Sequence, residues 1–432
     1  VAWISGGREL LAALFALVAV AVYFAGEMTL RRFALATALF LTSLLCKPSV
    51  AMLPFVVFGL EWIVRGSTGR PVFLRMGIWA TFAAAAAWLT KLAQGDYDIP
   101  LGLRERLTLV LDTYSFYLQK FVAPLSLSAN YGRTPEVALA EGTLVAAVIM
   151  TCAVLAGFVF LAWRRDRRYS LILLWFLAML PVSGLIPFAH QLISTVSDHY
   201  NYLPMSLLAA LTAFVLSRIG WKDSIAKGLL FIMIAGLGLM SANRARAWTS
   251  DQAFFTDMSK MSPDSYATAL GMSIVMCEDV KNFEEGVKWT EIALKAKPLD
   301  IVALANQAYC FLHSRNYFRV IELEYYLGQM NIDELEATQP TAYSSLLSSI
   351  GSAYIEQQEL EDGFQFLCEA LRVKPSEPSH QNNLDIAKEM LKSKGIEPTC
   401  EQVQAPDENT DPIQDVWPQL EKGNDGGADE EP

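Results

Sequence analysis

Eight apolar stretches of membrane-spanning length fill the first 242 residues and constrain the fold more than any other feature of the sequence. About 20 apolar residues in a helix cross the hydrocarbon core of a bilayer. The sequence therefore predicts an all-α chain whose residues 1–242 form a polytopic transmembrane bundle of about eight spans. The spans are expected at about 9–26, 32–46, 48–64, 72–93, 139–163, 169–187, 200–217 and 226–242. The second stretch ends at Lys47 and Pro48, so it can also join the third as a broken hairpin.

The two halves of the chain differ in charge. Residues 1–242 carry 19 Lys and Arg against 12 Asp and Glu, a net +7, whereas residues 243–432 carry 15 against 33, a net −18. This acidic balance argues against a nucleic-acid partner. Twelve basic residues lie in alternate short loops: Arg31, Arg32, Arg65, Arg70, Arg75, Arg164, Arg165, Arg167, Arg168, Arg218, Lys222 and Lys227. The positive-inside rule places these loops in the cytoplasm, and places the start of the chain and residue 243 on the external side.

Residues 94–138 both begin and end on the external side by the same rule, so they are not expected to contain a single span. Within them, residues 107–127 have apolar side chains at helical spacing, with Asp112, Gln119 and Lys120 on other faces. This pattern is typical of an interfacial helix. We expect an external re-entrant segment near 107–127.

The second half of the chain contains an internal repeat. Residues 283–298 match residues 360–375 at a constant offset of 77, and Asn316 begins an intermediate unit 34 residues after Asn282. Small residues in register let paired helices approach closely, and a proline ends each unit. The pattern predicts a soluble tetratricopeptide-repeat (TPR) α-solenoid at 264–397. Its parts are expected at about 264–298, 299–339 and 340–375, with a capping helix at 379–394 and a connector helix before them at 243–263.

The remaining segment and the cysteines predict little chemistry. Residues 398–432 form an acidic tail, and residues 401–432 hold ten acidic residues and one lysine, a composition typical of disorder. The six cysteines show no CxxC or Cys/His spacing, so no metal site is expected and most are interpreted as buried free thiols. No phosphate-binding loop, Rossmann fingerprint or nucleophile elbow occurs, which disfavours a cytoplasmic nucleotide-sugar site.

Candidate functional residues gather at positions predicted to be external. A lysine at a helix break suits a phosphate, although Lys47 beside Pro48 also fits an ordinary interfacial lysine. In the loop after residue 188, Asp198 and His199 can form an acid–base or orienting pair. Tyr200 and Tyr202 beside them also fit an aromatic belt. A second polar cluster runs from Asn130 to Arg133.

Several segments taken in order resemble one family. They are Val-Ala-Trp-Ile-Ser-Gly-Gly-Arg from Val1, Leu-Leu-Cys-Lys-Pro-Ser from Leu44, Pro-Leu-Ser-Leu-Ser-Ala-Asn-Tyr from Pro124, and Asp-His-Tyr-Asn-Tyr-Leu-Pro from Asp198. Over about residues 1–395 the chain resembles membrane-embedded TPR proteins related to the transmembrane-and-TPR O-mannosyltransferases, in the GT-C class of glycosyltransferases. The resemblance implies transfer of a sugar from a polyprenyl-phosphate donor to an acceptor outside the membrane.

The resemblance also has two departures. Relatives usually read Asp-Arg-Tyr where this chain reads Asp198, His199 and Tyr200, which replaces a permanent cation with a titratable group. The resemblance further implies that the catalytic carboxylates lie upstream of Val1, so the catalytic residues stay unassigned. The residues expected to bind the donor lipid-phosphate or substrate are Arg8, Lys47, Arg133, Asp198, His199, Tyr200 and Tyr202.

Two functions remain open on the sequence. The first is a GT-C-type glycosyltransferase that uses a lipid-linked sugar as substrate rather than a resident cofactor, with the TPRs binding an acceptor or envelope protein. The second is a non-catalytic membrane-anchored TPR scaffold for an envelope complex. Both place the chain in a bacterial inner membrane, in contact with membrane lipid, with the TPRs and C-terminus in the periplasm.

Overall fold

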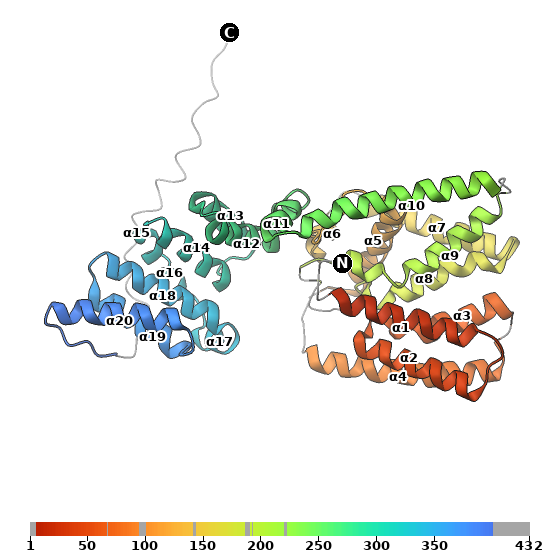
Figure 1. Ribbon diagram of the computed structural model, residues 1–432, viewed down its shortest axis with the longest axis horizontal. Helices are drawn as coiled ribbons and strands as arrows, with labels where there is room; N and C mark the ends of the chain where they lie inside the picture. Colours follow the sequence, from red (N-terminus) through yellow and green to blue (C-terminus); the bar gives the residue numbers. More distant parts are fainter. Residues whose placement is uncertain are drawn as a thin grey trace, which may run out of the picture. The chain divides into compact units, whose positions relative to one another are not determined.

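The computed structural model describes residues 6–66, 68–94, 101–140, 144–185, 191, 193–219 and 223–400. Throughout these ranges the regular structure is helical and no β-strand is found, which confirms the all-α prediction (Figure 1). The chain divides into two compact units, residues 1–269 and 270–432. Residues 1–5, where the resemblance begins, and residues 401–432 of the predicted acidic tail lie outside the described residues.

Unit 1 consists of apolar helices joined by short turns. Its α-helices are α1 Gly7–Phe24, α2 Leu30–Cys46, α3 Leu53–Arg65, α4 Arg70–Gln94, α5 Leu103–Val122, α6 Pro135–Ala140, α7 Leu144–Arg164, α8 Leu171–Met179, α9 Met205–Ser217, α10 Asp223–Ala245 and α11 Asp251–Ser259. Its 3-10 turns include η2 Pro48–Met52, η3 Arg167–Ser170, η4 Leu180–Val182, η6 Asp198–Asn201 and η7 Arg246–Trp248.

Five helical stretches of the described chain are long and apolar enough to cross a membrane. They are Gly7–Phe24, Pro48–Arg65, Arg70–Ala93, Val145–Arg164 and Ser224–Trp248. The other three predicted spans contain shorter helices, because α2, α8 and α9 have 17, 9 and 13 residues. These lengths support a membrane protein, and the count of eight spans stays a prediction.

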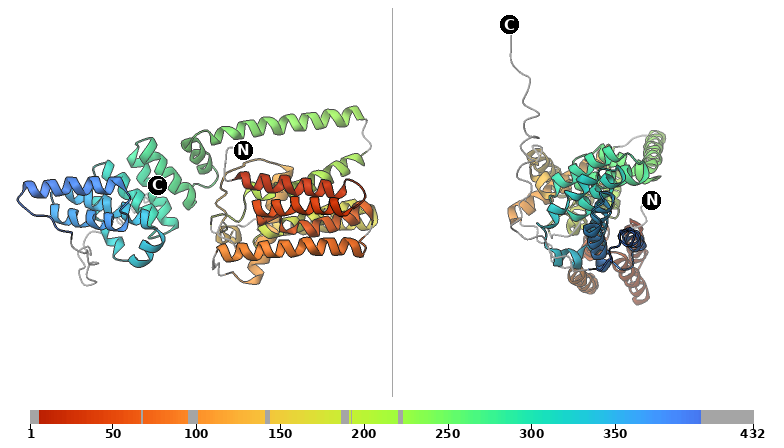
Figure 2. Two further views of the ribbon diagram at one scale, coloured as in Figure 1. Left: turned by 60° about the horizontal axis from the view of Figure 1, so that its bottom comes forward. Right: turned by 90° about the vertical axis from the view of Figure 1, so that its left-hand side faces the viewer.

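The first four helices pack around Trp79. Small residues on one face of α1 let it lie directly against α2, and these two helices and α4 run side by side (Figures 1 and 2). Trp79 of α4 stacks on Phe40 with ring centroids 4.7 Å apart and donates to Thr37 Oγ1 at 2.8 Å. Because an indole N–H needs a partner when buried, this bond fixes α4 on α2.

The chain breaks at Lys47, as the sequence predicts. Lys47 is extended, with φ −161° and ψ 129°, and Pro48 begins η2. A proline cannot continue the preceding helix but suits the first turn of the next one. The break directs the Lys47 side chain to the same end of the bundle as the first turn of α1, where Glu9 lies.

A second core in unit 1 surrounds Trp175 of α8. Tyr114 and Tyr117 of α5 and apolar residues of α9 pack there. The Tyr114 hydroxyl donates to the Phe176 carbonyl at 2.8 Å. α5 occupies the stretch in which the sequence predicts a re-entrant segment, and its buried side chains form part of this core.

Unit 2 is a series of helix pairs. Its helices are α12 Tyr266–Ile274, which begins in unit 1, the π-helical turn η8 Val275–Asp279, α13 Phe283–Ala296, α14 Ile301–His313, α15 Tyr317–Ile321, α16 Glu324–Leu327, α17 Ile332–Thr338, α18 Pro340–Glu356, α19 Leu360–Val373 and α20 Pro378–Ser393. α18 packs on α14 and α19, and α19 packs on α20. α20 occupies the stretch expected to form the capping helix.

The turns of unit 2 repeat with the spacing seen in the sequence. Lys281, Arg315 and Gln358 each have positive φ, at 61°, 60° and 69°. They are separated by the same offsets of 34 and 77 residues that relate the sequence segments. A non-glycine residue with positive φ is uncommon, so three at repeat spacing indicate one turn geometry used three times.

Four cysteines form disulfides, so the prediction of buried free thiols is wrong for them. Cys277 bonds to Cys310 and Cys368 to Cys400, with Cα atoms 5.6 and 5.7 Å apart. Partners lie 33 and 32 residues apart in the sequence, and no short motif links them. Cys46 and Cys152 are the free thiols.

Close helix contact in unit 2 depends on glycine, and this predicts a stability effect. A Cβ on Gly363 would lie 2.7 Å from the Gly351 carbonyl oxygen. We expect Gly363→Ala to destabilise the protein by about 1–3 kcal/mol, the usual cost of overpacking. Thermal unfolding of the purified chain measures this. Gly328→Ala is the matched control, because its Cβ would meet its nearest atom at an ordinary 3.6 Å; equal effects of the two changes would contradict the prediction.

Candidate functional site

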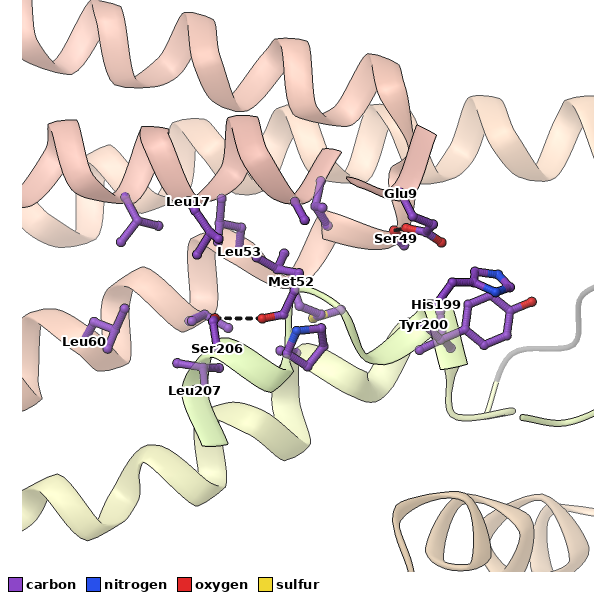
Figure 3. A pocket seen from close by; sticks show the side chains of 18 residues that line it. Glu9, Leu17, Ser49, Met52, Leu53, Leu60, His199, Tyr200, Ser206 and Leu207 are labelled. Atoms are coloured by element: carbon purple, nitrogen blue, oxygen red, sulfur yellow. Dashed lines mark hydrogen bonds between the residues drawn. The ribbon is translucent and has the colours of Figure 1, made fainter. Parts of the chain in front are cut away.

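Three segments far apart in the sequence meet at one pocket of unit 1. They are the first turn of α1, η2 just after the break at Lys47, and η6 (Figure 3). The Glu9 carboxylate forms an ion pair with Lys47 and accepts a hydrogen bond from Ser49 Oγ at 3.0 Å. Lys47 Nζ lies 5.5 Å from the centroid of the Tyr200 ring. An ionisable cluster therefore stands where these segments meet.

The pocket has one polar end and an apolar length. Glu9, His199 and Tyr200 lie at one end, whereas Leu17, Leu60 and Leu207 lie toward the other (Figure 3). The cavity measures about 110 Å³. The lining thus joins an ionisable end to apolar side chains, in a volume below the roughly 300–1,000 Å³ of typical ligand pockets.

Hydrogen bonds hold η6 firmly against α5 and α8. The Tyr117 hydroxyl accepts from the Ser197 amide at 2.9 Å and donates to the Ser197 carbonyl at 2.8 Å. Trp175 Nε1 donates to Asn201 Oδ1 at 3.1 Å. Ser197 Oγ lies 2.7 Å from His199 Nδ1, which orients the imidazole. The short loop segment is thus positioned as precisely as a core element.

Asp198 belongs to a second cluster rather than to the pocket lining. Its Oδ1 accepts a hydrogen bond from the Tyr131 hydroxyl at 2.7 Å. Lys120 Nζ lies 5.3 Å from the Tyr131 ring centroid and donates to the Leu125 and Ser126 carbonyls at 2.6 and 3.0 Å. Burial raises the pKa of Asp198, and the Tyr131 hydrogen bond and the Lys120 charge oppose that rise.

Arg133 is held by a buried ion pair. Its Nη2 lies 3.0 and 2.9 Å from the two carboxylate oxygens of Asp112 on α5. The Arg133 carbonyl also accepts from the Thr195 amide at 2.7 Å. Arg133 therefore ties the loop after α5 to the segment before η6.

The structure brings together only part of the predicted set. His199 and Tyr200 line the pocket, and Lys47 contacts two lining residues, Glu9 and Tyr200. Arg8 is exposed on the first turn of α1 beside Glu9. Tyr202 is 42% exposed next to η6, while Asp198 and Arg133 meet other partners. His190 of the same loop lies outside the described residues.

Glu9 is the residue that the sequence reasoning missed. It is only 6% exposed although it stands at the start of an apolar helix. A carboxylate at the edge of a predicted span is costly and invites a functional or ion-paired role. That criterion, applied to Lys47, would have found Glu9 as well.

Comparisons with known proteins give no family for the chain. No family model matches it, and neither a curated protein nor a solved structure matches it. Within the described residues, no group of three or more His, Cys, Asp or Glu side chains is placed to hold a metal ion.

The raised pKa of Asp198 predicts how its replacement affects stability. A carboxyl with a raised folded-state pKa binds more protons when folded than when unfolded, so stability falls as pH rises from the unfolded pKa of about 3.9 through the folded value. Asp198→Asn keeps an oxygen for the Tyr131 hydroxyl and removes the ionisation. We expect the variant to be more stable than the wild type at pH 7, with the gain shrinking toward pH 4.

Thermal unfolding of the full chain in detergent at pH 4 to 7 measures this. Asp264→Asn is the control because Asp264 is an exposed acid of the same unit. An Asp198→Asn variant that is less stable at pH 7, or whose effect does not depend on pH, would show that the burial of Asp198 is fully compensated.

Proposed function

We propose that the membrane unit is a GT-C-like glycosyltransferase that takes a sugar from a polyprenyl-phosphate donor and transfers it to an extracytoplasmic acceptor. The observation that supports this most is the pocket of unit 1, which joins an apolar length to an ionisable end. A polyprenyl-phosphate sugar has the same division between a long apolar chain and a charged head. The resemblance of the pocket segments to GT-C signatures points to the same class of substrate.

In this proposal Lys47 is the main phosphate ligand. Its ammonium has three donors, and the ion pair with Glu9 leaves capacity for a phosphate oxygen. Arg8 adds a second cation at the same end of α1, and Tyr200 and Tyr202 border the sugar. His199 carries a titratable nitrogen where relatives have arginine, so protonation would strengthen its attraction for the phosphate.

We further propose that unit 2 is a TPR domain on the external side of a bacterial inner membrane, where it binds the acceptor or an envelope protein. Three positive-φ turns at repeat spacing support the repeat architecture. Two disulfides support an external location, because disulfides persist in oxidising compartments and are rare in the cytosol. The basic loops of unit 1 would then face the cytoplasm.

One observation favours the alternative, a non-catalytic membrane scaffold. Lys47 is already neutralised by Glu9, so a purely structural ion pair also accounts for its position. Deleting unit 2, residues 270–432, separates the two functions. An enzyme would retain donor binding in its membrane unit, whereas a scaffold would lose all measurable activity with its repeats.

A pair of variants tests the phosphate role of Lys47. We expect Lys47→Ala to weaken binding of a polyprenyl-phosphate sugar about tenfold or more, because a hydrogen bond between charged groups is worth roughly 1.5–3 kcal/mol. The Glu9→Gln/Lys47→Met double variant removes both charges and leaves no unpaired one. Binding of a radiolabelled polyprenyl-phosphate sugar by the chain in proteoliposomes is the measurement, with Arg70→Ala as a control for the loss of one exposed cation of unit 1.

The double variant distinguishes the two roles. A phosphate ligand predicts that donor binding stays weak when both charges are removed. Donor binding that returns to the wild-type affinity would assign Lys47 to structure alone. Absence of donor binding by the wild-type chain would instead reject the glycosyltransferase and leave the scaffold.

The external location of unit 2 predicts the redox state of its cysteines. Chain extracted from membranes without reductant should bind two equivalents of iodoacetamide under denaturing conditions, at Cys46 and Cys152. After reduction it should bind six. Intact mass measures both values. Six labelled thiols before reduction would contradict an oxidising compartment for unit 2.

A further inference from the structure

A second cleft of unit 1 lies at the C-terminal end of α10. It measures about 670 Å³ and is walled by the loop at residues 124–127, the last turn of α10, η7 and α11. None of the residues that line it borders the Glu9 pocket. It is therefore separate from the Glu9 pocket, and the proposed function assigns it no role.

The cleft carries a cationic excess. Its lining includes Arg244, Arg246 and Lys260 but only one carboxylate, Asp257, which forms an ion pair with Arg244. The charged side chains of the lining therefore sum to a net charge of +2. Asn243, Ser250, Gln252 and Thr256 add amide and hydroxyl groups that can donate hydrogen bonds. Cations combined with neutral donors are the groups that proteins use to hold phosphate oxygens.

One wall of the same cleft is apolar. Leu125, Leu127 and Met240 line it, and Leu125 is 64% exposed. Met240 belongs to the apolar stretch of α10, which buries none of its membrane-spanning window inside the chain. Lipid chains therefore have access along α10 up to the cationic end of the cleft.

The basic residues of α10 lie at the two ends of its apolar stretch. Lys227 is near the start of the helix and Arg244 is near its end. Trp248 follows at that end and contacts Phe254, with ring centroids 4.8 Å apart. Aromatic residues gather at membrane–water interfaces, which places the cleft at headgroup depth.

We propose that this cleft binds the phosphate of an anionic lipid headgroup whose chains lie along α10. Arg246 and Lys260 contact the phosphate oxygens, and the polar side chains complete the shell. Basic pockets beside membrane helices recognise anionic lipids in this way. The apolar wall favours a lipid over a free phosphate, because a free anion gains nothing from leucine and methionine.

Native mass spectrometry of the full chain in detergent tests this proposal. The probes are dioleoyl phosphatidylglycerol, dioleoyl phosphatidylcholine and inorganic phosphate. We expect the wild type to retain phosphatidylglycerol in preference to phosphatidylcholine. The Arg246→Gln/Lys260→Gln variant should bind phosphatidylglycerol about tenfold or more weakly, as expected for the loss of charge-assisted hydrogen bonds.

The matched control is Arg70→Gln/Arg104→Gln, which removes two exposed cations of the same unit away from the cleft. Its affinity for phosphatidylglycerol should equal that of the wild type. Equal weakening in both double variants would overturn the cleft as the site. Inorganic phosphate that binds as tightly as phosphatidylglycerol, and is lost in the cleft variant, would overturn the lipid as its ligand. Circular dichroism identifies any variant that fails to fold. The Arg246→Lys/Lys260→Arg variant keeps both charges and should bind phosphatidylglycerol as the wild type does.

Discussion

The arrangement of unit 1 depends on neutralising carboxylates in an apolar interior. Among the described residues of this unit, Glu9, Glu61 and Asp112 are the acids with no more than 6% exposure. Each meets a cation: Lys47, Arg65 and Arg133 respectively. An isolated buried charge costs several kcal/mol, so each acid determines where a cation must lie. The Glu9 pair holds the break after α2 against the first turn of α1, and the Asp112 pair holds the loop after α5 against that helix. The Glu9 pair therefore joins two of the segments that meet at the pocket.

The same constraint shapes the candidate site. A phosphate at the pocket would share Lys47 with Glu9, so the carboxylate moderates the attraction that the lysine exerts on any anion. Asp198 and Tyr200 contact different groups although they are only two residues apart. This is because η6 is a 3-10 turn, in which successive side chains point about 120° apart. One face meets Tyr131 and the other meets the pocket. A one-turn segment thus connects two clusters of ionisable groups.

Local sequence patterns predicted the features that depend on residues close together in the chain. The helical class, the long apolar helices and the break before Pro48 follow from hydropathy and from the geometry of proline. The partners of Arg133 and Glu9 depend on how separate helices pack, and no spacing rule encodes that. The disulfides were not predicted for the same reason, since Cys277 and Cys310 meet only through the packing of separate helices. The sequence also did not predict that α8 is short, because its apolar stretch continues past Met179 into the turn at Pro181.

In unit 2, geometry repeats more faithfully than sequence. Lys281, Arg315 and Gln358 differ in chemistry, and none is glycine, yet all three adopt positive φ. That conformation costs about 1–3 kcal/mol at a non-glycine residue, so the surrounding structure must impose it. After two of these turns the next amide bonds five residues back, from Asn316 to Phe311 and from Glu359 to Tyr354, and after the first it bonds six residues back, from Asn282 to Met276. The π-helical turn η8 accounts for the extra residue, because a π-helical turn holds one residue more than an α-helical turn. The shared positive φ and the close approach at glycines such as Gly351 and Gly363 let the helices of unit 2 pack closely although the three turn residues differ.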